Sequence, residues 1–141
     1  MANVKYNNFG RAIAKSDIDL VVIKAMFMAP GYTPNRDTHV FLSDISASRA
    51  AGSTDLTVAG LTMTADNTDD RTEFDINDLV TGVITIVGGT NAVVFYIDTG
   101  VAATSELLTY NDLLLAGVQT TFFPVGGTLT ATVNVNGIFS I

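Results

Sequence analysis

Short runs of alternating apolar and polar residues, separated by turn residues, dominate the chain from Asp55 onward. In the clearest run, residues 128–135, one leucine, one alanine and two valines alternate with threonines and an asparagine. A period of two places successive side chains on opposite faces of an extended strand. The run therefore predicts a half-buried β-strand, and the shorter runs before it predict several more.

Glycine-containing pairs mark the expected turns between these runs. The clearest hairpin prediction joins residues 80–87 to residues 92–98 through Gly88-Gly89-Thr90-Asn91. Gly126-Gly127 predicts a further turn. Asn136-Gly137 predicts another, because Asn-Gly supplies the left-handed backbone that a two-residue hairpin loop requires.

Other segments are read from their apolar content. Residues 20–28 (LVVIKAMFM) are β-branched and apolar enough for a buried strand, and residues 71–76 predict a short strand. Gly60 falls where the alternation of residues 56–65 changes phase, which indicates a bulge or a tight bend. Residues 105–117 fit either a helix capped by Ser105 or a strand followed by a turn at Asn111-Asp112.

Two short helices are expected in the N-terminal third. Residues 7–15 could form one, although Gly10 weakens that prediction. Thr33 followed by Pro34 suits a cap and a first helical position, and it predicts a short helix over residues 37–45. With about eight short strands in addition, we expect a single mainly β domain over residues 1–141, an antiparallel β-sandwich or a barrel.

Composition narrows the class of protein. The chain has 141 residues, no cysteine, 14 acidic residues against 7 basic ones, and a net charge of −7. All seven basic residues lie at or before Arg71, so the second half would repel phosphate and nucleic acid is not an expected partner. No apolar stretch is long enough for a membrane span and no leader sequence is recognisable, so we expect neither a membrane partner nor export by the usual route.

No metal site is predicted. The single histidine, His39, has Asp37 nearby but lacks the further ligands of a zinc site, and we interpret it as a hydrogen-bonding residue of a loop. Residues 66–70 (DNTDD) could offer oxygen atoms to calcium, yet they lack the glycine and distal glutamate of an EF-hand loop. A hydrogen-bonded turn is the favoured interpretation.

Catalysis and cofactor binding are not expected either. Glu73, Asp75 and Asp78 could be imagined as a glycosidase pair, but the chain has no tryptophan and no apparent aromatic cleft to raise one pKa. No nucleophile, base and orienting group can be assembled from the sequence. We therefore predict a protein that is not an enzyme and has no cofactor.

Several longer stretches resemble a family of small structural proteins of tailed-phage virions. They are ANVKYNNFGRAI (residues 2–13), VVIKAMFMAPGYTPNRDTHVFLSDI (21–45), TADNTDDRTEFDINDL (64–79), YIDTGVAATSELLTY (96–110) and GTLTATVNVNGIFSI (127–141). The shared features are patterns of turns and strands, such as the loop YTPNRDTH, and not catalytic signatures. Residues 79–91 depart from the family, which tends to have an aromatic-containing segment there.

The resemblance implies a virion component assembled in the host cytoplasm. We expect a capsid decoration (cement) protein that binds the outside of the head shell, with the major capsid protein and further copies of itself, as a trimer or another homo-oligomer, as partners. The alternatives are a tail, baseplate or fibre-associated structural protein and a carbohydrate-binding β-sandwich. The last would need exposed aromatic platforms, for which the four tyrosines are the candidates.

The N-terminal segment, residues 2–15, and the loop of residues 31–39 are the expected docking surface, because together they hold most of the positive charge. Deleting residues 2–10 is expected to abolish capsid binding and to leave the isolated fold intact. The candidate docking residues are Val4, Tyr6, Phe9, Arg11, Tyr32, Asn35, Arg36 and His39.

Overall fold

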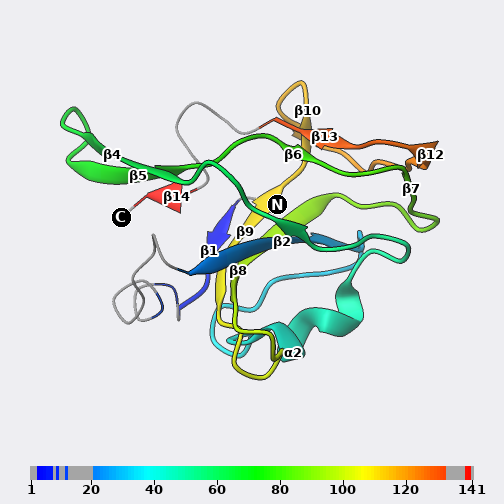
Figure 1. Cartoon of the computed structure of the whole chain (residues 1–141), viewed down its shortest axis with the longest axis horizontal. Helices are drawn as coiled ribbons and strands as arrows, with labels where there is room; N and C mark the ends of the chain where they lie inside the picture. The colour runs from blue at the N-terminus through cyan, green and yellow to red at the C-terminus, as the bar shows by residue number, and fades with distance from the viewer. Residues whose placement is uncertain (1–2, 8, 10–11, 13–20, 133–138, 141) are drawn as a thin grey trace.

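The computed structural model describes residues 3–7, 9, 12, 21–132 and 139–140, and these residues are mainly β (Figure 1). A five-stranded antiparallel sheet, in the order β1-β9-β8-β2-β3, forms the middle of the molecule. The expected antiparallel, sandwich-like class is confirmed, and the described sheets are open and not closed into a barrel. The central strands are β1 (Val4–Lys5), β9 (Leu107–Asp112), β8 (Ala92–Asp98), β2 (Val22–Met28) and β3 (Leu56–Thr57).

The two neighbouring strands β2 and β8 are mostly apolar, and Lys24 of β2 is the exception that pairs with Asp98 at the end of β8. They pair without interruption from Val22 opposite Asp98 to Met28 opposite Ala92. Every residue of β8 except the last is buried. A strand covered on both faces shows no alternation of polarity, which is why its sequence is apolar throughout. The strand predicted over residues 20–28 is confirmed for the seven residues of β2.

The hairpin predicted between residues 80–87 and 92–98 is wrong. β7 (Ile84–Thr85) pairs with β12 (Val125–Gly127), whereas β8 pairs with β2 and β9. A strand that is apolar on both faces buries more surface in the centre of a large sheet than in an isolated hairpin. The turn at residues 87–88 therefore leads the chain from one layer into the other.

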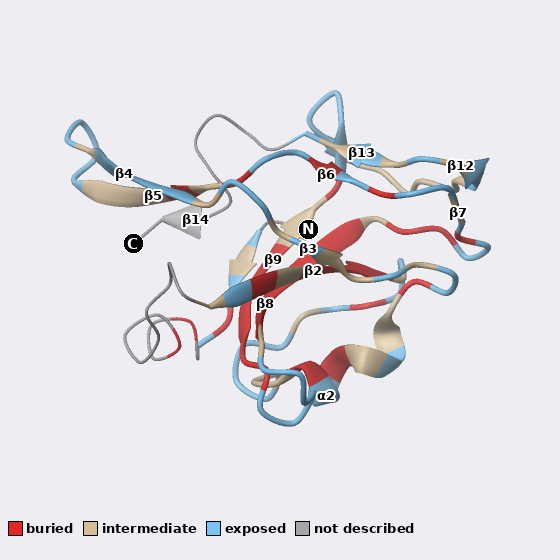
Figure 2. Ribbon diagram, viewed as in Figure 1, coloured by how far each residue is buried: buried red, intermediate tan, exposed pale blue. Residues whose placement is uncertain are grey.

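A second layer of small antiparallel sheets covers one face of the central sheet (Figure 2). Phe95 and Leu108 of the central sheet pack in one cluster with Phe74 and Leu79 of this layer. The pairs are β4 with β5, β5 with β14, β6 with β13, β7 with β12 and β10 with β11. Their bounds are β4 (Thr62–Asp66), β5 (Arg71–Asp75), β6 (Leu79–Val80), β10 (Leu114–Leu115), β11 (Val118–Gln119), β13 (Thr130–Ala131) and β14 (Phe139–Ser140).

Turn predictions in this layer have mixed outcomes. The turn of residues 66–70 and the strand after it are confirmed as the β4–β5 hairpin. Gly60 has a φ of +69°, and a Cβ there would collide with the Asn77 side chain, so the predicted bend is confirmed. The turn at Gly126-Gly127 is wrong, because both glycines lie in β12 beside a register shift opposite β7. The predicted turn at Asn136-Gly137 lies outside the described residues.

The other face of the central sheet is covered by loops, α2 (Leu42–Ile45) and η1 (Ser46–Ser48). Met26 and Val94 pack there against Leu42 and Ile45. The helix predicted over residues 37–45 is wrong apart from its last four residues. The Asn35 side chain accepts hydrogen bonds from the backbone N–H groups of residues 37 and 38, which holds a turn where the helix was expected.

The start of α2 is fixed by one acidic side chain. Asp44 accepts hydrogen bonds from the backbone N–H groups of Val40 and Phe41, and these bonds lower the pKa of its carboxyl group. Most of the short helix predicted over residues 7–15 lies outside the described residues. Residues 105–117, which fitted helix or strand, contain the strands β9 and β10. The turn expected at Asn111-Asp112 is wrong, because both residues lie in β9.

Candidate functional site

The loop of residues 31–39 lies against the N-terminal strand on the face of the central sheet away from the second layer. Asn7 connects the two segments: its backbone N–H donates to the Arg36 carbonyl, and its side-chain Nδ2 donates to Asp37 Oδ1 at 2.6 Å. Tyr6 and Tyr32 belong to the cluster that packs on this face. The structure therefore brings together the two segments that the sequence singled out for docking.

A chain of hydrogen bonds joins Tyr6, Tyr32 and His39 beneath the loop. The two tyrosine Oη atoms are 2.6 Å apart, and Tyr32 Oη is 2.9 Å from His39 Nδ1. The backbone N–H of Asn35 also donates to that Nδ1, so the ring nitrogen is an acceptor and the Tyr32 hydroxyl donates to it. Tyr6 in turn donates to Tyr32, and burial raises the pKa of Tyr6, so that its proton stays in place.

The predicted docking residues divide by burial. Tyr6, Phe9 and Tyr32 are buried, Val4 and His39 are half-buried, Asn35 and Arg36 are exposed, and Arg11 lies outside the described residues. The buried aromatic side chains pack beneath the loop, and a partner cannot reach them while the chain keeps this fold. Docking through the exposed loop residues stays a prediction.

The structure argues against the expectation that residues 2–10 can be deleted without harm to the fold. β1 pairs with β9, and Tyr6 and Phe9 are 1% and 5% exposed in two different core clusters. Their loss would open both faces of the central sheet. Removing one buried aromatic residue typically costs about 3–5 kcal/mol.

Arg36 differs from the other described arginines and from Lys24. Lys24 Nζ is 2.7 Å from Asp98, Arg49 pairs with Asp55, and Arg71 pairs with three carboxylates. The exposed Arg36 side chain makes no ion pair with any residue that the structure describes. It is therefore the cation of this loop that is available to an acidic partner.

Asp55 is the centre of a structural network on the same side of the sheet. Arg49 donates to its two oxygens at 2.9 and 2.8 Å, and the Tyr96 hydroxyl donates to Oδ2 at 2.6 Å. Burial raises the pKa of Tyr96, which keeps this hydroxyl a donor. The network ties the segment after η1 to β8.

The DNTDD turn is held by the protein's own groups. Asp66 Oδ1 accepts backbone hydrogen bonds from Thr68 and Asp69, and its Oδ2 lies 3.2 Å from Arg71 Nε. Arg71 also lies within ion-pair distance of Asp69 and Glu73. Within the described ranges no cluster of three or more metal-ligating side chains is present. The hydrogen-bonded turn favoured by the sequence is confirmed.

The tyrosine platforms of a carbohydrate-binding module are not at the surface. Tyr6, Tyr32, Tyr96 and Tyr110 are all buried, and burial raises the pKa of Tyr110 to about 12. A sugar ring can stack only on an exposed aromatic face. None of these four side chains provides one.

A second surface, missed by the sequence reasoning, lies on the second layer. Residues 79–97 and 113–141 contain no charged residue, and residues 79–91 and 113–132 carry the strands β6, β7 and β10 to β13. We call the surface formed by residues 79–91 and 113–132 the uncharged face. The signal that could have found it is the absence of charge from two separate stretches that pair with each other.

The uncharged face also gathers most of the exposed apolar side chains. Eight of the eleven large hydrophobic residues that are exposed in the described chain belong to it. Val87 is 82% exposed and Val125 is 80% exposed. At such exposure an apolar side chain adds almost no hydrophobic stabilisation to the isolated chain. Exposed apolar side chains gathered on paired strands in this way are typical of an interaction site. The eight residues are Val80, Val83, Val87, Leu114, Leu115, Val118, Phe123 and Val125.

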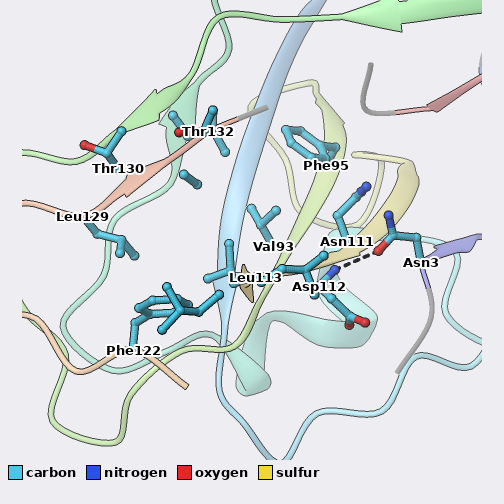
Figure 3. A pocket seen from close by; sticks show the side chains of 14 residues that line it. Asn3, Val93, Phe95, Asn111, Asp112, Leu113, Phe122, Leu129, Thr130 and Thr132 are labelled. Carbon is cyan, nitrogen blue, oxygen red and sulfur yellow. Dashed lines mark hydrogen bonds between the residues drawn. The ribbon is translucent and has the colours of Figure 1, made fainter. Parts of the chain in front are cut away.

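A pocket of about 560 Å³ opens between the central sheet and the uncharged face (Figure 3). Val93, Phe95 and Leu113 form its inner wall, and Phe122 and Leu129 lie across from them. The polar residues of its rim include Asp112, whose backbone N–H donates to the Asn3 side chain. The size is ordinary for a binding pocket, and the walls suit an apolar group.

Comparison with known proteins gives no match to any family model, any curated protein or any solved structure. No helix among the described residues is long and apolar enough to cross a membrane.

Proposed function

We propose that this chain is a virion structural protein, a decoration protein that binds the outside of a tailed-phage head and acts by adhesion and not by catalysis. The observation that carries the proposal is the uncharged face. An exposed apolar surface without charges is costly for a solitary protein in water, and burial against another protein removes that cost. The resemblance of the sequence to small virion proteins supports the phage assignment.

The end of the uncharged face formed by β7 and β12 is the proposed contact with the major capsid protein. Val83, Val87, Phe123 and Val125 are exposed there, and β7 and β12 form a sheet of only two strands. A two-stranded sheet is marginal alone, whereas a strand added along its edge supplies main-chain hydrogen bonds and covers apolar side chains. A subunit of the shell is the occupant that we propose.

The distribution of charge supports the same orientation. The β4–β5 hairpin, at the opposite end of the second layer from β7 and β12 (Figure 1), carries Asp66, Asp69, Asp70 and Glu73. With the uncharged end against the shell, this acidic hairpin faces solvent. An acidic outer surface keeps a layer of many copies soluble.

Copy number tests the proposal. Virions purified from the natural source of the chain would be digested and quantified by mass spectrometry against the major capsid protein. We expect a copy number within a small factor of that protein. A few tens of copies or fewer would overturn the head location in favour of a tail or baseplate component, and absence from the virion would overturn the proposal altogether.

A further inference from the structure

We infer that the pocket between the central sheet and the uncharged face is a binding site for one uncharged, mainly apolar small molecule. The inference goes beyond the proposed function, because adhesion to a shell needs no ligand. None of the described residues that line the pocket belongs to β7 or β12, the end of the face proposed for the shell. The two surfaces can therefore be tested independently.

The pocket lies between the two layers, where a sandwich normally packs its core. Leu79, Val93 and Phe95 belong to one cluster of buried side chains, and Leu113 belongs to another, with Leu129 packed against it. All five residues line the pocket. Protein interiors are usually filled at the density of organic crystals. An opening of about 560 Å³ between two core clusters is therefore room that the described side chains do not fill.

A small side chain on β13 helps to leave this room. Ala131 packs against both core clusters, pairs with Leu79 of β6 and lines the pocket. A larger apolar residue at this position would extend into the space. The neighbouring Thr130 and Thr132 line the pocket as well, and both are exposed. The pocket is therefore open along β13, where a ligand can enter.

The shape and the walls of the pocket favour a small apolar molecule. Leu114 and Leu115 are 55% and 61% exposed at its edge, and Phe122 and Leu129 are only half-buried. An apolar molecule seated between them removes its own surface and theirs from water, which favours binding. A concave site of this volume is typical for one drug-sized ligand.

Charge decides which apolar molecules fit. No basic residue is among the described residues that line the pocket, and its only acidic side chain, Asp112, accepts a hydrogen bond from the Gln119 amide at 2.8 Å. The chain has a net charge of −7, so an anionic ligand would meet repulsion and no counter-charge. A charged group of either sign would also lose its hydration against Val93 and Phe95. The pocket therefore favours an uncharged molecule.

The rim can accommodate one polar group on an otherwise apolar ligand. Asn3, Asn111 and Asp112 lie together on one side of the pocket (Figure 3). A hydroxyl or amide group there stays beside polar side chains and water, whereas the same group deeper in the pocket would face Val93 and Phe95 unpaired. We expect the ligand to bind with its apolar body inward and its polar end at this rim.

Two fluorescent probes of similar shape test the site. N-phenylnaphthylamine is uncharged, and anilinonaphthalene sulfonate has the same aromatic body with a sulfonate added. In titrations of the purified full chain, followed by probe fluorescence, we expect saturable binding of one uncharged probe per chain. The sulfonate should bind more weakly by about tenfold or more, because it meets no counter-charge. The uncharged probe at saturation should also raise the melting temperature, since it binds the folded chain.

Two variants and a matched control locate the binding. Ala131→Leu should weaken binding of the uncharged probe by about tenfold or more, because the larger side chain occupies the same space. Leu114→Gln should weaken it by about threefold to tenfold, because an apolar wall residue becomes polar. Val118→Gln is the control and should bind as the wild type does, since Val118 is 66% exposed on the same hairpin and is not among the lining residues.

Thermal unfolding by circular dichroism checks that each variant folds. Leu114 is already exposed, so Leu114→Gln keeps the test valid even if Ala131→Leu does not fold. The inference is overturned by an absence of saturable binding, by equal binding of the two probes, or by a folded Ala131→Leu chain that binds as the wild type does. An equal effect of Leu114→Gln and Val118→Gln would overturn it as well, because the probe would then lie on exposed apolar strands and not in the pocket. None of these results bears on copy number in virions, so failure of the site and failure of the proposed function are distinguishable.

Discussion

One substitution, Val125→Asp, tests the proposed contact with the shell. Val125 lies in β12 and is 80% exposed, so in the isolated chain the change should alter the free energy of unfolding by no more than about 0.5 kcal/mol. In the complex, the loss of a buried valine costs about 1.5 kcal/mol and a buried, unpaired carboxylate costs roughly 3 kcal/mol more. Together these effects weaken binding by about 1,000-fold, at 1.4 kcal/mol for each factor of ten.

Co-sedimentation with virions assembled without the chain measures the effect. Increasing concentrations of the purified variant are added, and the bound fraction gives the dissociation constant. Val125→Thr keeps the β-branched shape and should bind with an intermediate constant, within about a factor of ten of the wild type, because one methyl group is replaced by a hydroxyl, which costs far less to bury than a carboxylate. Val101→Asp, the same chemical change at an exposed valine outside the uncharged face, should bind like the wild type.

The reasoning is refuted if Val125→Asp binds as tightly as Val101→Asp while both remain folded. Such a result would mean that the β7–β12 end of the uncharged face stays in solvent on the virion. A loss of binding by both variants would be equally damaging, since it would trace the effect to net charge and not to the face.

The remaining predictions concern the loop surface and the fold. Asp55→Ala should lower the free energy of unfolding by about 1–3 kcal/mol in chemical denaturation, because it leaves the partly exposed Arg49 and a buried tyrosine hydroxyl without their carboxylate; an unchanged free energy of unfolding would contradict this. Deleting residues 2–10 should give a protein without a cooperative thermal transition, and a transition at the wild-type temperature would show that β1 is dispensable. Because the pKa of Asp44 is lowered in the folded chain, its contribution is complete above about pH 5 and lost as the pH falls below about 4. Asp44→Asn should therefore reduce the difference in melting temperature between about pH 6 and about pH 2.5, and an unchanged difference would refute the role of this cap. Arg36→Glu should weaken virion binding if the loop docks on an acidic partner, and wild-type affinity would exclude the loop.

The sequence predicted the strands well and their partners poorly. The buried strand β2 and the β4–β5 hairpin follow from local patterns, because an apolar run and an Asp-rich turn carry their own structural preference. The pairing partners of β8 do not follow from a local pattern. The position of a strand that is apolar on both faces depends on how the whole molecule buries it. Turn residues next to such a strand therefore suggested a hairpin that does not form.

The candidate site shows the same division. The sequence named the N-terminal segment and the loop of residues 31–39 as docking candidates because of their charge. The structure places the two segments side by side, which the sequence did not predict, and shows which of their side chains point inward. Aromatic residues such as Tyr6 and Tyr32 suit an interface and a core equally well, and only the packing decides between them. The uncharged face could not be predicted from the sequence, because only the strand pairs β6-β13 and β7-β12 show that the two uncharged stretches lie together.

Cryo-electron microscopy of the intact virion tests the central idea most directly, because it shows which surface of the chain is covered. We predict density for this chain on the outside of the head, with β7 and β12 against a capsid subunit and the β4–β5 hairpin pointing outward. A map in which Val87 and Val125 face solvent, or one in which no protein covers any part of the uncharged face, would contradict the account.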